Sequence, residues 1–81
     1  MGVAYVLITV ASTYEHKVYI QLSLLPEINE VYPVFGEYDF IAKILSKDMY
    51  TIGSIVVDKI RTIEGVIDTI TLTGLKFIAG F

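Results

Sequence analysis

The chain has 81 residues, of which 54% are hydrophobic, with no cysteine, a net charge of −3 and a mean hydropathy of +0.66. The length allows one domain, expected over residues 1–81, and the lack of cysteine excludes disulfide scaffolds, thiolate metal sites and thiol catalysis. The pI near 4.8 argues against direct nucleic-acid binding, because phosphate contacts need a basic surface. A domain this small and this apolar leaves hydrophobic surface uncovered, so we expect an oligomer.

The start of the chain is apolar but does not predict a membrane anchor. Its longest uncharged run, residues 1–14, has 14 residues, and about 18 are needed to span a bilayer. A signal peptide is not expected either, because no basic residue precedes the apolar run and no small-x-small cleavage site ends it. Together with the lack of cysteine, this predicts a cytoplasmic protein without membrane partners.

The first predicted elements are a strand and a helix. Residues 3–11 are apolar and β-branched, which predicts a strand buried on both faces and therefore central in its sheet. Ser12 and Glu15 have the S-x-x-E spacing of a capping box, which predicts that a helix starts there and ends before Pro26. The apolar positions of this helix form one stripe: Val18, Leu22 and Leu25.

A hairpin is predicted next. Residues 27–35 alternate as in a strand, and Pro33 places that strand at a sheet edge because proline cannot donate to a ladder. Gly36–Asp39 form a turn with glycine at the bend, and residues 40–46 return as an antiparallel strand.

A second helix and a last strand complete the series. Asp48 is a plausible N-cap, Gly53 inside the helix indicates close approach to its backbone, and Gly65 suits the C′ position. The apolar face of this helix is Ile52, Val56, Ile60 and Ile63, with Ile55 beside them. Residues 66–77 are predicted as a strand. By alternation, one of its faces carries Val66, Asp68, Ile70 and Leu72.

The order β-α-β-β-α-β predicts an α+β, ferredoxin-like fold. Two right-handed crossovers joined by a hairpin give a four-stranded antiparallel sheet with both helices on one face. The other face has no cover within the chain, although several strands carry apolar residues on both sides. We therefore expect a sheet-to-sheet homodimer of the dimeric α/β-barrel type.

The sequence lacks the residue patterns of several common kinds of catalytic and binding site. His16 is the only histidine, so a metal site or a nucleophile triad is unsupported and no cofactor is expected. Residues 11–13 offer neither glycine nor arginine for a phosphate-binding loop after the first strand. Basic and aromatic residues are too sparse on the central strands for an RNA-recognition module.

Two polar features remain, each with two interpretations. Gly36, Glu37, Tyr38 and Asp39 form either an ordinary turn or a polar nest for a ligand carboxylate and ammonium group. A period-two row of threonines is either a β-branched strand face or a ladder of hydroxyls that orients a ligand. The row consists of Thr69, Thr71 and Thr73.

The arrangement of these segments resembles a known family. The run from Tyr32 to Asp39 (YPVFGEYD), the helix end Ile63–Val66 (IEGV) and the Thr69-x-Thr71 strand follow one another in the predicted β-α-β-β-α-β frame. This is similar to the RAM domain (regulation of amino-acid metabolism), the effector-binding half of Lrp/AsnC transcription regulators. The likeness covers about residues 4–77. G-x-x-D and T-x-T are each unspecific, and their order and spacing carry the match.

The resemblance implies a ligand site and an assembly. In that family the G-x-x-D bend lies at the contact between dimers and contributes to amino-acid binding, which points to Gly36, Glu37, Tyr38 and Asp39. The T-x-T strand, here Thr69 and Thr71, contributes hydroxyls from a neighbouring subunit. Members pair their sheets into dimers that associate into rings such as octamers or decamers. They also carry a helix-turn-helix domain, which residues 1–81 lack, so the resemblance implies a stand-alone effector domain.

We therefore predict a non-enzymatic, oligomeric sensor of an amino acid or related metabolite. It acts on a full-length Lrp/AsnC-type regulator through mixed assembly, or on an unknown partner. One alternative is a purely structural oligomer. Another is a small dimeric α/β-barrel enzyme, which needs a buried acid or base; Asp68 comes nearest, and its place at a strand end favours contact with solvent.

Overall fold

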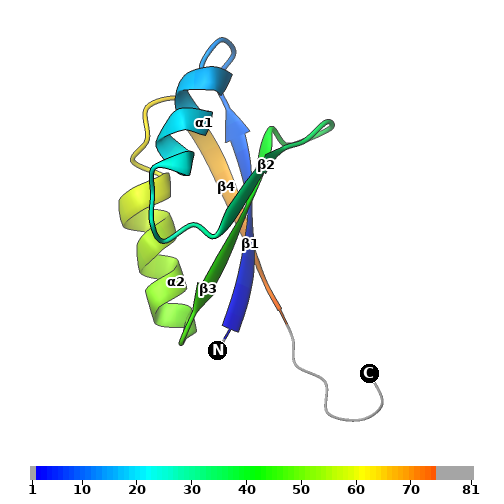
Figure 1. Cartoon of the computed structure of the whole chain (residues 1–81). Helices are drawn as coiled ribbons and strands as arrows, with labels where there is room; N and C mark the ends of the chain where they lie inside the picture. The colour runs from blue at the N-terminus through cyan, green and yellow to red at the C-terminus, as the bar shows by residue number, and fades with distance from the viewer. Residues whose placement is uncertain (1, 75–81) are drawn as a thin grey trace.

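Residues 2–74 are described by the structure, a computed structural model, and their elements alternate as the sequence predicts (Figure 1). In chain order they are β1 (Gly2–Val10), α1 (Glu15–Ser23), β2 (Glu30–Pro33), β3 (Phe40–Ser46), α2 (Met49–Ile55), its π-helical continuation η1 (Val56–Ile60) and β4 (Val66–Thr73). The predicted β-α-β-β-α-β order is confirmed. The end of the predicted last strand, residues 75–77, lies outside the described residues.

The strands form one antiparallel sheet in the order β2-β3-β1-β4. This order confirms that β1 is central and that the strand with Pro33 lies at an edge. β2 is shorter than the predicted strand over residues 27–35. The chain first turns, with Ile28 N–H donating to the carbonyl of Leu25 at 3.1 Å, and pairing with β3 begins only afterwards.

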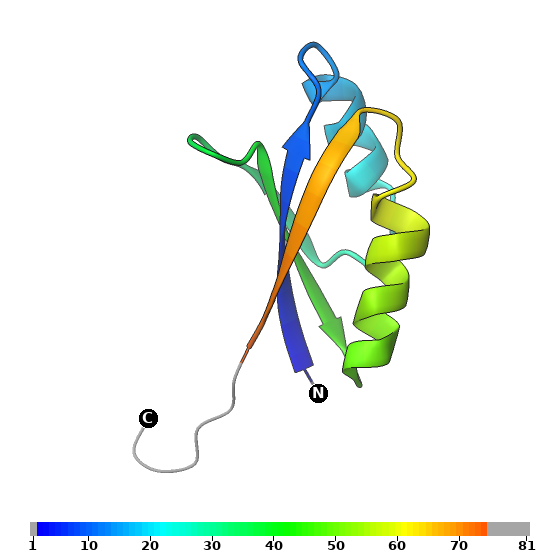
Figure 2. The ribbon, with the colours of Figure 1, turned by 180° about the vertical axis from the view of Figure 1, so that it is seen from behind.

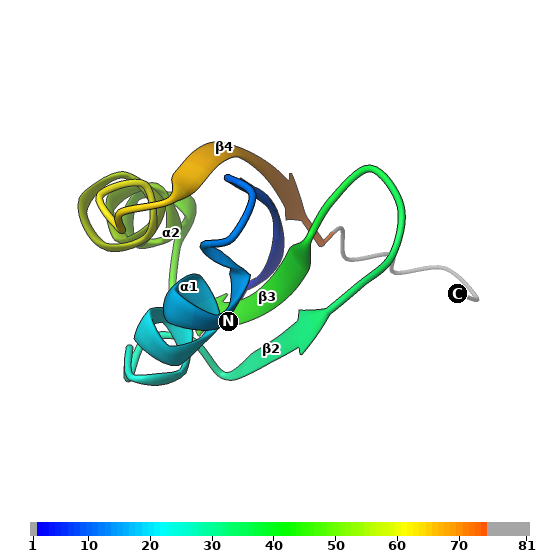
Figure 3. The ribbon, with the colours of Figure 1, turned by 90° about the horizontal axis from the view of Figure 1, so that it is seen from above.

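Both helices lie on one side of the sheet, and the core lies between them and the strands (Figures 2 and 3). β1 alternates accordingly: Ala4, Val6, Ile8 and Val10 are buried, whereas Tyr5 is 38% exposed. The prediction that this strand is buried on both faces is therefore wrong for a single chain. The helices cover one face and leave the other open.

The two helices start differently. Asp48 is confirmed as an N-cap, because its Oδ1 accepts a hydrogen bond from Thr51 N–H at 2.8 Å. The capping box at Ser12 and Glu15 is wrong: Tyr14 is the N-cap residue of α1, and no side chain caps this end. Ser12 instead lies in a tight turn that places Thr13 at φ +73° and is closed by Tyr14 N–H on the Ala11 carbonyl at 3.0 Å.

The second helix packs as predicted but ends differently. Ile52, Val56 and Ile60 are buried. Apart from its chain neighbours and the backbone of its own helix, no atom among the described residues lies within 4 Å of a Cβ built at Gly53, so the expected close approach is wrong. Gly65 is not the C′ residue either, because the helix has already ended at Ile60.

Gly65 belongs to the turn that leads into β4. The turn is closed by Val66 N–H on the Ile63 carbonyl at 3.1 Å, and Gly65 has φ +103°. A Cβ at this position would lie 2.7 Å from Cβ of Tyr14. Both the backbone conformation and the contact with Tyr14 therefore require glycine here.

A β-bulge shifts the faces of β4. Val10 pairs with Val66 and Thr9 pairs with Asp68, so the register slips between them. Val66 consequently packs against the core, and the prediction that it shares a face with Asp68 is wrong. Beyond the bulge the alternation holds, and Ile70 and Leu72 lie on the side away from the helices.

We call this uncovered side of the sheet the open face. Side chains of residues paired directly across strands share a face, so the register with Tyr5 and Leu7 of β1 defines its centre. Their partners are Lys43 and Ile41 on β3, and Leu72 and Ile70 on β4. Tyr5, Ile70 and Leu72 are 38%, 40% and 50% exposed, so the predicted apolar face is left uncovered by residues 2–74.

Candidate functional site

The bend between β2 and β3 extends away from the helices, on the side of the open face (Figures 1 and 3). It is closed by Val34 N–H on the Asp39 carbonyl at 3.0 Å, and Gly36 has φ +114°. Glu37 is exposed and Tyr38 is half-buried. At the tip the Phe35 side chain is fully exposed, at 106%. The bend therefore combines backbone and polar groups with one large, uncovered apolar side chain.

Asp39 fixes the bend to the end of β1. Its Oδ2 accepts a hydrogen bond from Val10 N–H at 2.7 Å, and its own N–H donates to the Ile8 carbonyl at 2.9 Å. One carboxylate oxygen thus satisfies the backbone where the ladder of β1 ends. Within residues 2–74 no hydrogen bond reaches the other oxygen, Oδ1. Asp39 consequently has a structural role and still offers an acceptor.

The predicted threonines lie elsewhere. Thr69 and Thr71 pair with Ile8 and Val6, so their side chains lie on the helix side of the sheet. β4 is an edge strand, and the helices do not cover them: Thr71 is exposed and Thr69 is half-buried.

One chain does not bring the bend and the threonines together. Ile8 pairs with Phe40 on one side and Thr69 on the other, so β1 separates the two groups. Neighbouring strands are about 4.8 Å apart, which puts the two backbones about 10 Å apart. The bend leans over the open face, whereas the threonines lie on the opposite face. A site that uses both groups requires a second chain.

Charged side chains on the open face form a cluster that the sequence did not reveal. Lys43 Nζ lies 3.5 Å from Glu30 Oε2, and the Tyr32 hydroxyl donates to Glu30 Oε1. The hydrogen bond from Tyr32, with the charge of Lys43, lowers the pKa of Glu30. The same bond raises the pKa of Tyr32. Strand alternation places these residues on one face, but only the register shows that they meet.

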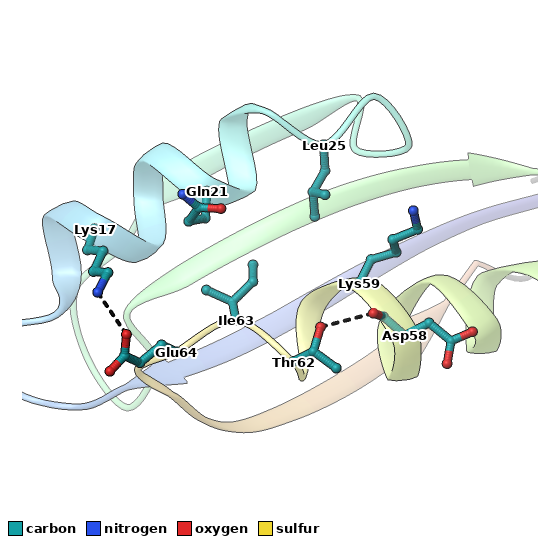
Figure 4. A pocket seen from close by; sticks show the side chains of 8 residues that line it. All are labelled: Lys17, Gln21, Leu25, Asp58, Lys59, Thr62, Ile63 and Glu64. Atoms are coloured by element: carbon teal, nitrogen blue, oxygen red, sulfur yellow. Dashed lines mark hydrogen bonds and ion pairs between the residues drawn. The ribbon is translucent and has the colours of Figure 1, made fainter.

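A groove of about 390 Å³ lies between α1 and the segment around the end of η1 (Figure 4). At one end Lys17 Nζ bonds Glu64 Oε1 at 2.8 Å, which raises the pKa of Lys17 and lowers that of Glu64. The two residues are 47 positions apart, and nothing in the sequence predicted the pair. Both side chains are more than half exposed, so the pair is a surface contact between α1 and the loop before β4.

The polar and charged residues within positions 2–74 lie at or near the surface. No polar or charged residue is buried in this part of the chain, and Asp68 is exposed, with Oδ1 accepting from Thr69 N–H at 2.9 Å. Nor does any group of three or more histidine, aspartate or glutamate side chains gather there in a way that could hold a metal ion. No helix between residues 2 and 74 is long and apolar enough to cross a membrane.

Solved structures with the same architecture include a protein from Thermus thermophilus, TTHA0845. It is 32% identical, with a TM-score of 0.89 over 96% of this chain and 98% of that one. The transcriptional regulator NMB0573 of Neisseria meningitidis, solved as a complex with L-Met, is 20% identical, with a TM-score of 0.83 over 95% of this chain and 51% of that one. At that identity the second likeness shows the fold alone.

Curated relatives are longer than the matched segment. An HTH-type transcriptional regulator of Pyrococcus horikoshii, PH1916, is 40% identical over 52 residues, which cover 64% of this chain and 35% of the regulator. The homocitrate synthase of Sulfurisphaera tokodaii is 33% identical over 66 residues, 82% of this chain but 14% of the enzyme. Because most of that enzyme lies outside the match, the likeness assigns no catalytic activity to this chain.

The family model for the Lrp/AsnC ligand-binding domain matches residues 3–78. That range includes the hairpin bend, the threonine strand and every helix described above. The chain belongs to the Lrp/AsnC ligand-binding domain family of transcription regulators.

Proposed function

We propose that this chain is a non-enzymatic, oligomeric module that binds an amino acid or a related small metabolite between subunits. The observation that carries the proposal is the separation of the two polar groups. Gly36–Asp39 and the Thr69/Thr71 pair lie on opposite faces of one sheet. A site that uses both groups needs two chains, and contact between chains can combine them. The match to the Lrp/AsnC ligand-binding domain supports a small ligand, and the L-Met complex of a regulator with the same fold makes amino acids the first class to test.

Pairing of two open faces is the first step of the proposed assembly. Tyr5, Ile70 and Leu72 expose apolar surface on neighbouring strands, and a second copy of the chain presents the same surface in return. Burying apolar area yields about 25 cal/mol per Å², so covering several such side chains favours association. Further contacts through the exposed bend would then join dimers into the octamer or decamer rings that we expect.

The proposed action is modulation of transcription through mixed assembly with a full-length Lrp/AsnC-type regulator. The match to PH1916 supports this partner class, because the same domain forms part of that longer regulator. A ligand shifts such an assembly only as far as it binds one state more tightly than the other. A purely structural oligomer is the alternative, and it predicts an assembly that no metabolite changes.

Thermal unfolding with each of the twenty amino acids tests the proposal. A ligand at 100 times its Kd stabilises a site by about 2.7 kcal/mol, and each kcal/mol moves the midpoint by roughly 4–8 °C in a domain of this size. We expect a shift with one or a few amino acids. No shift with any of them would contradict amino-acid binding and favour the structural oligomer.

A further inference from the structure

A charged cluster interrupts the apolar open face on its β2–β3 side. Glu30 is directly opposite Lys43 in the strand register, and Nζ of Lys43 lies 3.5 Å from Oε2 of Glu30. Oε1 of Glu30 accepts a hydrogen bond from the Tyr32 hydroxyl. Both carboxylate oxygens therefore have partners from the same chain. As a complete set, Glu30, Lys43 and Tyr32 carry no net charge.

Aromatic and apolar side chains of the open face border the cluster. Tyr5 lies opposite Lys43 on β1, and Ile41 lies opposite Tyr32 on β3. A sheet packed against these residues would remove the cluster from water. In that environment a complete ion pair is tolerated, whereas one charge without its partner is strongly unfavourable. In water the same pair would contribute little.

The neutrality of the cluster favours a second copy of this chain over a charged partner. A two-fold contact brings the same patch of both chains into one interface. A lysine at position 43 without its carboxylate would therefore enter that interface twice, as two like charges. A partner of opposite charge would require no neutralisation within the chain. Within each chain Glu30 neutralises Lys43. This removes the repulsion between the two lysines, which arises only when the chain pairs with its own copy.

We propose that the Glu30–Lys43 pair, held by Tyr32, determines whether the open face accepts a second copy of this chain. This inference rests on the sheet-to-sheet pairing in the proposed function. Two open faces can pair when Glu30 and Lys43 are both charged, or when both charges are absent. If either charge is lost, the remaining charges of the two copies are alike and repel each other when the open faces pair.

Sedimentation equilibrium of the full chain and five variants tests this. Glu30→Gln keeps an acceptor for Tyr32 and leaves Lys43 unpaired, and Lys43→Met leaves Glu30 unpaired. We expect each to raise the dimer dissociation constant by at least about tenfold. The double variant should return to within about threefold of the unmodified chain. Lys17→Met is the matched control: it breaks a shorter pair, 2.8 Å, on the helix side, and should leave association unchanged.

Single variants that dissociate no more than Lys17→Met would overturn the inference. So would a double variant as weak as the single ones, because side-chain shape rather than charge would then decide. Leu72→Lys, which puts an unpaired charge on the apolar part of the open face, distinguishes a failure of the sheet pairing from a failure of the cluster's role. If Leu72→Lys does not weaken association, the sheet pairing itself is wrong. If Leu72→Lys weakens association and the single cluster variants do not, only the proposed role of the Glu30–Lys43 pair is wrong. Circular dichroism confirms that each variant is folded.

Discussion

The N–H of Val10 and the carboxylate of Asp39 meet at 2.7 Å, although the residues are 29 positions apart. This bond attaches the hairpin bend to the end of the central strand. The same aspartate is one of the four bend residues proposed for the ligand site, and its carboxylate is the group that would face a ligand ammonium group. Its side chain is therefore already oriented by the fold, and substitutions at this position must distinguish stability from binding.

Two substitutions of Asp39 make that distinction. Asp39→Ala leaves the partly buried Val10 N–H without an acceptor, and we expect a loss of about 1–3 kcal/mol in the free energy of unfolding. Asp39→Asn keeps an oxygen acceptor but removes the charge, so we expect a smaller loss of stability together with loss of the ligand-induced thermal shift. Urea unfolding and thermal shifts measure the two effects. A ligand response retained in Asp39→Asn would remove this charge from the proposed site.

Three glycine-to-alanine substitutions should change the free energy of unfolding by amounts that differ in sign and size. Gly65→Ala combines φ +103° with a contact at 2.7 Å from Tyr14, so we expect a loss above about 1 kcal/mol. Gly36 has a similar φ of +114°, but a Cβ built there meets no atom within 4 Å, so Gly36→Ala should lower the stability less. Gly53→Ala, in a helix and with open space, should gain about 0.5–1 kcal/mol. Urea midpoints rank the three, and equal losses at positions 65 and 36 would contradict the contact with Tyr14.

The N-cap of the second helix predicts a dependence on pH. The hydrogen bond from Thr51 N–H lowers the pKa of Asp48 below its ordinary value of 3.8. A lowered pKa means that the carboxylate stabilises the fold above that value, and that this contribution disappears as the pH falls through the lowered pKa. Asp48→Ala should therefore be less stable than the unmodified chain at neutral pH and should converge with it in acid. Urea midpoints measured down a pH series test this, and a constant difference at every pH would contradict it.

Phe35 and Phe40 provide a matched pair of truncations. Phe40 is buried, at 4% exposure, and Phe40→Ala should cost about 3–5 kcal/mol of stability. Phe35 is fully exposed, at 106%, so Phe35→Ala should leave the fold unchanged. If the bend lies at a contact between chains, the same change should weaken association, which sedimentation velocity measures. Unchanged association would place the tip of the bend outside any contact.

The sequence predicted the elements whose signals are local. Strand 40–46 matches β3, Asp48 caps the second helix, and Ile52, Val56 and Ile60 form its buried face. Each depends on residues close in the chain, such as helical spacing or a side chain that bonds its own first turn. The capping box failed because Ser12 lies in a turn that the same residue types also favour.

Features that depend on pairing between distant strands were not predictable. The bulge beside Val66 reverses its face, and alternation along one strand cannot reveal a slip against another. The contact between Lys43 and Glu30 likewise depends on the register of β2 with β3. For the proposed site, the sequence indicated the residue types in the bend and in the threonine strand. It did not show that one chain holds them on opposite faces.

Mixing two binding-deficient variants tests most directly whether the site is shared between chains. Asp39→Asn impairs the bend, and Thr69→Val with Thr71→Val removes the strand hydroxyls. We expect each protein alone to show no thermal shift with the amino acid that stabilises the unmodified chain. After the two are unfolded and refolded together, some sites combine an intact bend with intact threonines, and calorimetric titration should detect binding at about a quarter of the sites. A refolded mixture that binds no more than either variant alone would contradict a site formed between subunits.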